Sequence, residues 1–183
     1  MTNGSPIRVG RDFEEEFPGA DAAAAEAAAN LVRTTSLWMA EVTRRRRAVA
    51  DLSPSGFQAL AILEGAAEPL PSTVIADRLL ISTASMTSLL DTLERRGLVV
   101  RDPHPKDRRK ILVRLTDPGY ALVDAVLPIV HGAATEAFAA LDEGEREVLV
   151  ELLGRVQGRL ADLAGRPFPA AGPRRPPRLR GGR

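Results

Sequence analysis

The 183-residue chain contains no cysteine and only two histidines, His104 and His131. Without cysteine there can be no disulfide, no thiolate nucleophile, no Cys-ligated metal and no thiol-based redox switch. The chain also shows no glycine-rich loop after a strand, and no pair of carboxylates beside a nucleophile. We therefore expect no catalytic residues, no metal site and no organic cofactor, so the protein is not predicted to be an enzyme.

Aromatic residues are scarce at 4%, whereas hydrophobic residues make up 44% of the chain, with alanine and leucine dominant. This balance favours helices packed on helices, and the length suits one domain with a full core. No apolar run approaches 18 residues, and no charged-then-apolar leader opens the chain. The sequence therefore predicts neither a membrane span nor a secretory signal, and a cytoplasmic location is the expectation.

The stretch from Ser82 to Gly97 predicts a helix with two unlike faces. Ser82 suits the N-cap, and Gly97 suits the left-handed residue that ends a helix. A buried stripe with i, i+3, i+4, i+7 spacing is formed by Met86, Leu89, Leu90 and Leu93. The candidates for DNA contact on this helix are small residues, namely Ser82, Thr83, Ala84, Ser85, Thr87 and Ser88. Small side chains let a helix enter a major groove, where methyl groups contact thymine and hydroxyl groups bind base edges.

After Gly97 the hydrophobic period changes from 3.6 to 2, and two strand-like runs flank a turn rich in proline and charge. Residues 101–114 carry six Arg or Lys against two Asp, a net charge of +4, while the whole chain is only +1. We expect a hairpin with a cationic tip. Its candidate DNA-contacting residues are Lys106, Asp107, Arg108, Arg109 and Lys110.

Long helices are predicted on both sides of this unit. Asp21 begins the first, which ends near a run of four arginines, 44–47. That run is either a solvated helix end or a phosphate contact. The last helix begins at a capping box of Asp142 and Glu145. It carries an apolar seam close to heptad spacing, formed by Leu149, Leu152, Leu153, Val156, Leu160 and Leu163. Because an apolar seam on a terminal helix must be buried, we expect it to form a homodimer.

The chain divides into four parts on this interpretation. Residues 1–19 form a flexible N-terminal arm, residues 53–116 a DNA-binding lobe, and residues 20–52 and 117–164 a helical dimerisation region. Residues 165–183 form a disordered tail that is rich in proline and carries six arginines without an acid. The tail either adds non-specific DNA affinity or is inert.

The sequence resembles the MarR family of winged helix-turn-helix transcription regulators over roughly residues 30 to 163. The resemblance rests on the run 93–99 (LERRGLV), followed by the pattern D-x-R, L-x-L-T, x-x-G. That pattern is filled here by Asp107, Arg109, Val113, Leu115, Thr116 and Gly119. It implies a mainly α fold with a small β-hairpin wing, in which a helix-turn-helix lobe is flanked by long dimerisation helices. A glycine is usual in the family where Leu80 stands, so this chain must make the turn with a less permissive residue.

The resemblance also implies a function. Family members are commonly homodimeric repressors that bind double-stranded DNA at inverted repeats, with the D-x-R pair placing an arginine in the minor groove. Many release DNA when a small aromatic or phenolic effector binds. Trp38 and Phe57 are candidates to line such a site, although such residues are more often part of a plain core. The rival interpretation is a winged-helix module that binds protein, or DNA without sequence preference, and has no ligand response.

Overall fold

The computed structural model describes residues 4–105 and 107–165, with the backbone alone at positions 108 and 109. The chain forms two compact units, Met1–Arg45 and Arg46–Arg183, and each is described by itself. The predicted tail lies outside the described residues, apart from Gly165.

The first unit contains α1 (Phe13–Glu16) and α2 (Ala22–Arg46), whose last residue begins the second unit. The N-cap of α2 is Asp21, whose Oδ1 accepts from the backbone N–H of Ala24 at 3.0 Å. Within the arm predicted for residues 1–19, Ile7 and Val9 bond to α2, and the flexibility of the arm stays a prediction. Asn30 on α2 accepts from the N–H of Ile7 at 2.9 Å and donates to its carbonyl oxygen at 3.0 Å, and Glu26 accepts from the N–H of Val9. The sequence did not predict these bonds, because they join side chains of α2 to backbone groups about 20 residues away.

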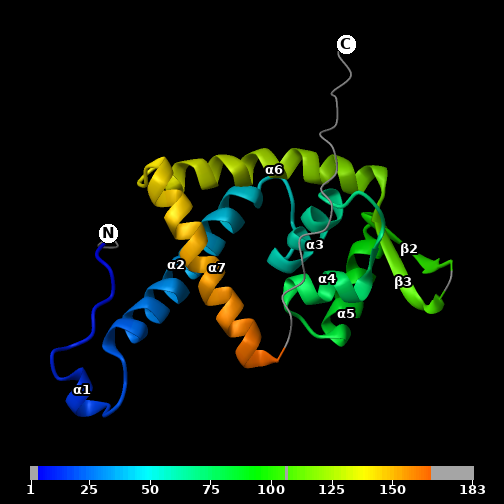
Figure 1. Cartoon of the computed structure of the whole chain (residues 1–183). Coiled ribbons are helices and arrows are strands. Elements are labelled where there is room, and N and C mark those ends of the chain that lie inside the picture. The colour runs from blue at the N-terminus through cyan, green and yellow to red at the C-terminus, as the bar shows by residue number, and fades with distance from the viewer. Residues whose placement is uncertain (1–3, 106, 166–183) are drawn as a thin grey trace. The chain divides into compact units, whose positions relative to one another are not determined.

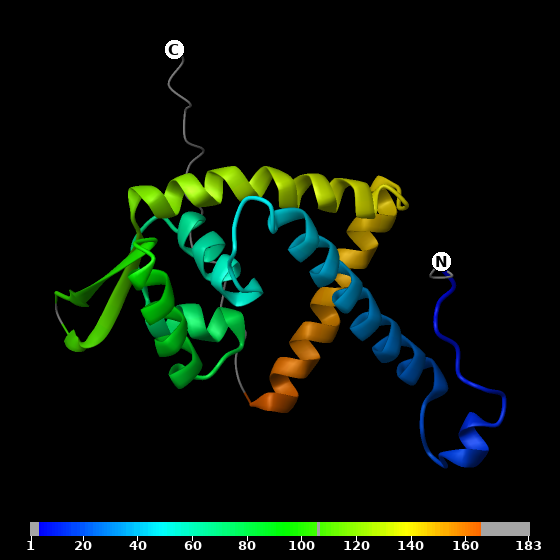
Figure 2. The same ribbon diagram turned by 180° about the vertical axis from the view of Figure 1, so that it is seen from behind.

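The second unit has a helical lobe with a small antiparallel sheet (Figures 1 and 2). Its helices are α3 (Pro54–Glu64), α4 (Ser72–Leu79), α5 (Thr83–Arg95), α6 (Asp117–Phe138) and α7 (Glu143–Ala164). Its strands are β1 (Leu70–Pro71), β2 (Val99–His104) and β3 (Asp107–Leu115), in the order β1-β3-β2. The predicted mainly α fold with a hairpin wing is confirmed.

The sheet has one strand more than the sequence predicted. Leu70 and Pro71 pair with Val113 and Leu112 of β3, in a stretch where the sequence predicted no strand. Two residues are too few to show a period of 2, so this strand could not be recognised from its pattern.

The core of the second unit draws on four helices and the hairpin strands. Five side chains with no exposed surface come from α3, α4, α5, β3 and α6 respectively, namely Leu60, Ile75, Leu93, Val113 and Val123. These five elements therefore share one core.

Four helices begin at side-chain caps, including the predicted caps Ser82 and Asp142. The side chains of Ser53, Ser82, Thr116 and Asp142 accept from backbone N–H groups three residues ahead, at 2.8–3.1 Å. Glu145 completes the capping box by accepting from the N–H of Asp142 at 2.9 Å. Each bond satisfies a donor that the first helical turn leaves without a partner.

The start of α6 is tied to the end of α5. The hydroxyl of Thr116 donates to the carbonyl of Gly97 at 2.6 Å, and Gly97 has φ +68°. A Cβ at Gly119 would lie 2.1 Å from the carbonyl oxygen of Leu98. Only glycine fits at this position, which gives the x-x-G part of the motif a steric reason.

Helix α6 is long and apolar enough to cross a membrane by length and composition alone, which the search for apolar runs did not show. The same test is passed by core helices of soluble proteins. Val123, Val126 and Ala133 of α6 are buried, with Val126 packed against Phe57 of α3. Of the apolar window of α6, 17% is buried within the chain.

Candidate nucleic-acid interface

The turn before α5 is made by a leucine in a left-handed conformation. Leu80 has φ 54° and ψ 38°, and it is the one non-glycine residue with positive φ in the described chain. The N–H groups of Leu80 and Ile81 still bond back to Asp77 and Ala76, so α4 ends in the ordinary way. The departure from glycine therefore leaves the turn intact, at the expense of local strain.

Helix α5 has the two faces that the sequence predicted. Met86, Leu90 and Leu93 are buried, while Leu89 is partly buried. All six candidates for DNA contact on this helix and its cap are exposed: Ser82, Thr83, Ala84, Ser85, Thr87 and Ser88. The structure thus brings them together on one surface, and their contact with DNA stays a prediction.

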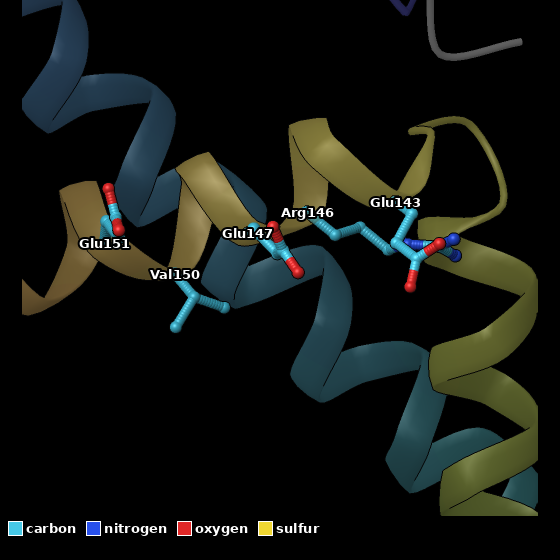
Figure 3. A pocket seen from close by; sticks show the side chains of 5 residues that line it. All are labelled: Glu143, Arg146, Glu147, Val150 and Glu151. Carbon is cyan, nitrogen blue, oxygen red and sulfur yellow. The ribbon is translucent and has the colours of Figure 1, made fainter.

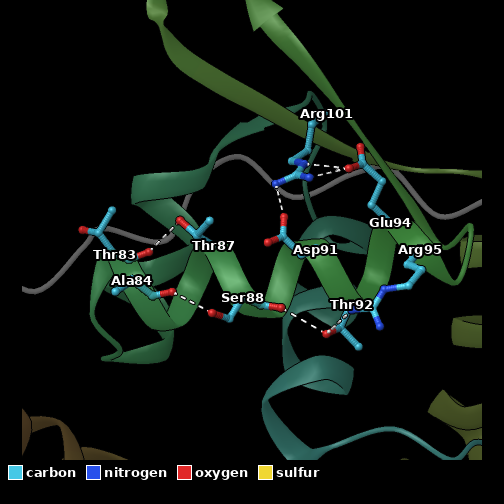
Figure 4. A network of polar contacts seen from close by, with 9 residues as sticks. All are labelled: Thr83, Ala84, Thr87, Ser88, Asp91, Thr92, Glu94, Arg95 and Arg101. Carbon is cyan, nitrogen blue, oxygen red and sulfur yellow. Dashed lines mark hydrogen bonds and ion pairs between the residues drawn. The ribbon is translucent and has the colours of Figure 1, made fainter.

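The hydroxyl groups on this face are directed back into the helix. Thr87 donates to the carbonyl of Thr83 at 3.0 Å, and Ser88 donates to that of Ala84 at 3.3 Å (Figure 4). In this arrangement the hydroxyl protons are used within α5. The surface then offers methyl groups and oxygen lone pairs, which suit thymine methyls and base amino groups.

The hairpin of β2 and β3 has an irregular tip. Its register shifts between Pro103 and His104, and His104 lies opposite Asp107. Lys106 lies outside the described residues, as do the side chains of Arg108 and Arg109, so the predicted Asp107–Arg109 pair stays a prediction. Lys110 is exposed and Asp107 is partly buried.

Among the hairpin cations whose side chains the structure describes, Arg101 and Arg114 pair with acids. Arg114 pairs with Asp102 inside the hairpin, at 3.1 Å. Arg101 instead reaches α5, where it pairs with Asp91 at 2.8 Å and with Glu94 at 2.5 Å (Figure 4). The hydrogen bond from Arg101 holds the pKa of Glu94 below its usual range. Arg101 and Arg114 are therefore engaged by acids of the protein.

Asp91, Glu94 and Arg101 were missed by the sequence reasoning. A signal was present, because two acids three residues apart lie on one side of a helix. Nothing in the sequence, however, indicated that they face Arg101 rather than solvent.

A small hollow separates part of α5 from the hairpin. Its volume is about 150 Å³. The lining residues are Ser72, Thr83, Met86, Thr87, Leu90, Arg101 and Ile111. Side chains therefore do not fill the space between the first turns of α5 and the hairpin.

The residues predicted for ligand binding lie in different units. Trp38 is partly buried on α2 of the first unit. Phe57 is 6% exposed and packs with Ala50 and Val126 in the second unit. For Phe57 the core role that the sequence left open is present in the structure. In the described part of the chain, no three His, Asp or Glu side chains gather as a metal site would require.

The predicted dimerisation seam lies on the surface of α7. Leu149 and Leu153 are partly buried, while Leu152, Val156, Leu160 and Leu163 are 47–67% exposed. No residue of α7 is buried.

Known proteins match both the sequence and the fold. Residues 50–110 match the model of the MarR family. The HTH-type transcriptional regulator MhqR of Bacillus subtilis is 31% identical over 105 residues, which are 57% of this chain and 72% of that protein. The match to another Bacillus subtilis regulator spans 51% of that protein.

Two solved structures are similar over most of their own length. The transcriptional repressor CouR bound to a 23-mer DNA duplex has a TM-score of 0.65 and 27% identity, covering 82% of this chain and 99% of that one. Bordetella bronchiseptica BpsR, whose DNA binding is regulated by 6-hydroxynicotinic acid, has a TM-score of 0.63 and 26% identity, covering 69% and 89%. An exposed helix of small side chains, a wing beside it and these relatives lead to one conclusion. The chain belongs to the MarR family, and it is a transcriptional regulator that binds DNA rather than an enzyme.

Proposed function

We propose that the protein is a cytoplasmic homodimeric repressor that binds an inverted-repeat operator and releases it when a small aromatic or phenolic ligand binds. The observation that carries the proposal is the combination of one exposed DNA-facing helix with an apolar seam on α7. One lobe binds one half-site, and pairing of the α7 seams in a homodimer places a second lobe on the other half-site.

The seam and the charged side of α7 lie on opposite sides of the helix. Figure 3 shows a shallow hollow lined by Glu143, Arg146, Glu147, Val150 and Glu151 on the charged side. At 100° per residue, the six seam residues cluster on the other side. A monomer would leave Leu152, Val156, Leu160 and Leu163 about half exposed in water. Pairing with a second copy removes that apolar surface, and each fully buried side chain contributes about 1.5–3 kcal/mol.

A two-fold dimer sets the form of the operator. Two α5 helices related by a two-fold axis fit half-sites about 34–36 Å, or roughly 10 bp, apart on one face of the duplex. The operator is then an inverted repeat. The Asp107-x-Arg109 motif suits a narrow minor groove beside each half-site, where the negative potential attracts a guanidinium.

Repression and ligand release rest on similarity. CouR is a repressor, and the DNA binding of BpsR is regulated by 6-hydroxynicotinic acid. A ligand that binds the dimer better in one arrangement of its lobes shifts the population toward that arrangement, which changes operator affinity. Trp38 and Phe57 are the residues we would examine first.

Selection of duplexes from a random DNA pool tests the proposal directly. We expect the recovered sequences to share an inverted repeat, and sedimentation of the complex to give two chains per duplex. Arg109→Ala should weaken binding to the recovered duplex about tenfold or more, the effect of losing one specific contact. Recovered sequences with no common pattern would instead indicate a non-specific module. Unchanged affinity across a panel of aromatic acids would refute ligand release alone.

A further inference from the structure

A single arginine joins the hairpin to the DNA-facing helix. From β2, Arg101 donates through Nε at 3.0 Å and through Nη2 at 2.5 Å to Glu94, and its Nη1 lies 2.8 Å from Asp91 (Figure 4). Asp91 and Glu94 lie three residues apart on α5, so both carboxylates meet one guanidinium. The side chain of Arg101 is 28% exposed, so the surrounding protein restricts the conformations that it can adopt.

A hollow of about 150 Å³ lies beside Arg101, so these ion pairs can determine how the hairpin is placed relative to α5. Where side chains do not fill the space between two elements, packing does not fix their separation there. The directional hydrogen bonds of a guanidinium can fix it instead.

Charge alone gives no reason for Asp91 and Glu94 on this helix. Carboxylates on a DNA-binding lobe repel phosphates, and their removal should strengthen binding to any duplex. Arg101, in turn, directs three of its N–H groups at these acids, so it is poorly arranged to serve as a phosphate contact.

We propose that Arg101 is a positioning residue anchored by Asp91 and Glu94, and that the three residues fix the angle between the wing and α5. Helix and wing tip then reach their two grooves at the same time. The proposal rests on the DNA-binding function proposed above, and it adds which residues fix the angle between the wing and α5.

The first experiment removes negative charge from α5, which by charge alone should strengthen DNA binding. The duplex recovered by selection with the wild-type protein serves as the specific probe, and a scrambled duplex as the non-specific one. The double variant Asp91→Asn, Glu94→Gln should bind the specific duplex about tenfold more weakly, within the usual range of a positional coupling. Its binding to the scrambled duplex should be equal or tighter.

Asp102→Asn is the matched control, because Asp102 pairs with Arg114 inside the hairpin and not across to α5. This variant should bind both duplexes as well as the wild type or better. If the double variant also binds the specific duplex as tightly as the wild type, or more tightly, the anchoring role is wrong and the acids act only through their charge.

The second experiment does not depend on DNA. Because the chain has no cysteine, Ser88→Cys and Lys110→Cys place two spin labels on exposed sites of α5 and β3. The labelled protein is diluted into unlabelled protein, so that distances within one chain dominate. A narrow distance distribution that broadens in the double variant, but not in Asp102→Asn, supports the proposal. An unchanged distribution overturns it, whatever the DNA result, whereas failure of the wild type to select any duplex would count against the proposed function.

Discussion

The lobe and the last helix of the same unit differ in where their apolar side chains lie: those of the lobe are buried, and those of α7 are largely exposed. In the lobe, α3, α4, α5, β3 and α6 each place a side chain at 0% exposure in a shared core. Helix α7 has 22 residues and buries none of them, although its apolar seam is as regular as the stripe of α5. The lobe therefore buries its apolar stripes within one chain, whereas α7 leaves its seam largely exposed.

The same comparison separates two kinds of sequence signal. A stripe flanked by caps and turns, as in α5, finds its partner within a few tens of residues. The seam of α7 stays largely exposed within one chain, and the proposed homodimer would cover it.

The strongest test of this contrast places charge in the seam. Val156→Glu with Leu160→Glu should convert the protein to a monomer, since each protomer loses two apolar side chains that are worth about 1.5–3 kcal/mol each when buried. Specific DNA affinity should fall at least a hundredfold, while the circular dichroism of the lobe persists. Sedimentation equilibrium measures the first effect. Val150→Glu, on the charged side of α7, is the control and should remain a dimer; a dimeric double variant would place the interface elsewhere.

The stability of the lobe should be most sensitive to substitutions in its interior. Gly119→Ala should lower the free energy of unfolding by about 3 kcal/mol, because the added Cβ would meet the backbone of Leu98 at 2.1 Å. Urea unfolding provides the measurement. Gly132→Ala, on the same helix with no atom within 4 Å of its Cβ, should instead gain about 0.5–1 kcal/mol. Equal effects of the two substitutions would show that the contact at Gly119 relaxes easily.

The strain before α5 should be removable. Leu80→Gly should raise the free energy of unfolding by about 0.5–1 kcal/mol, since relief of roughly 1–2 kcal/mol of left-handed strain exceeds the entropy cost of glycine. Leu80 is 75% exposed, so little apolar burial is lost. Leu80→Ala keeps a Cβ and should show no such gain. A loss of stability in Leu80→Gly would mean that the leucine side chain makes contacts that outweigh the strain.

The smallest effect is expected in the first unit, where Arg44 and Arg45 donate to Glu41 and lower the pKa of its carboxyl to about 2. A folded-state pKa below the unfolded value contributes stability above about pH 4.5, which is lost as the pH falls toward 2. The contribution is small, because the pair is solvent-screened. The melting temperature of the wild type should exceed that of Glu41→Gln slightly at pH 7, and the gap should close below pH 4. A constant gap would assign it to something other than ionisation.

Much of the fold could be predicted from local rules. Ser82, Thr116 and Asp142 cap helices because their side chains reach backbone donors three residues away, a relation that lies within one turn. The two-faced α5 and the change of period after Gly97 are equally local. The strand β1 was missed because its identity depends only on its pairing with β3.

The site divides along the same line. The sequence placed the small residues of α5 on one face, because helical periodicity alone decides which residues share a side. It could not reveal that Arg101 is held by Asp91 and Glu94, since that contact depends on how the hairpin folds back over α5.

The run Arg44–Arg47 shows the division most plainly. By itself the sequence determined four adjacent cations at the end of a helix, together with the caps, the stripes and the charge of the hairpin. Arg44 and Arg45 pair with Glu41 one turn back on the same helix, which is again a local relation. Tertiary structure decided that Arg46 is buried and donates to the carbonyl of Leu52 at 2.5 Å. Local geometry is encoded within a turn or two of chain, but the partner of a long side chain depends on which distant segment comes to lie beside it.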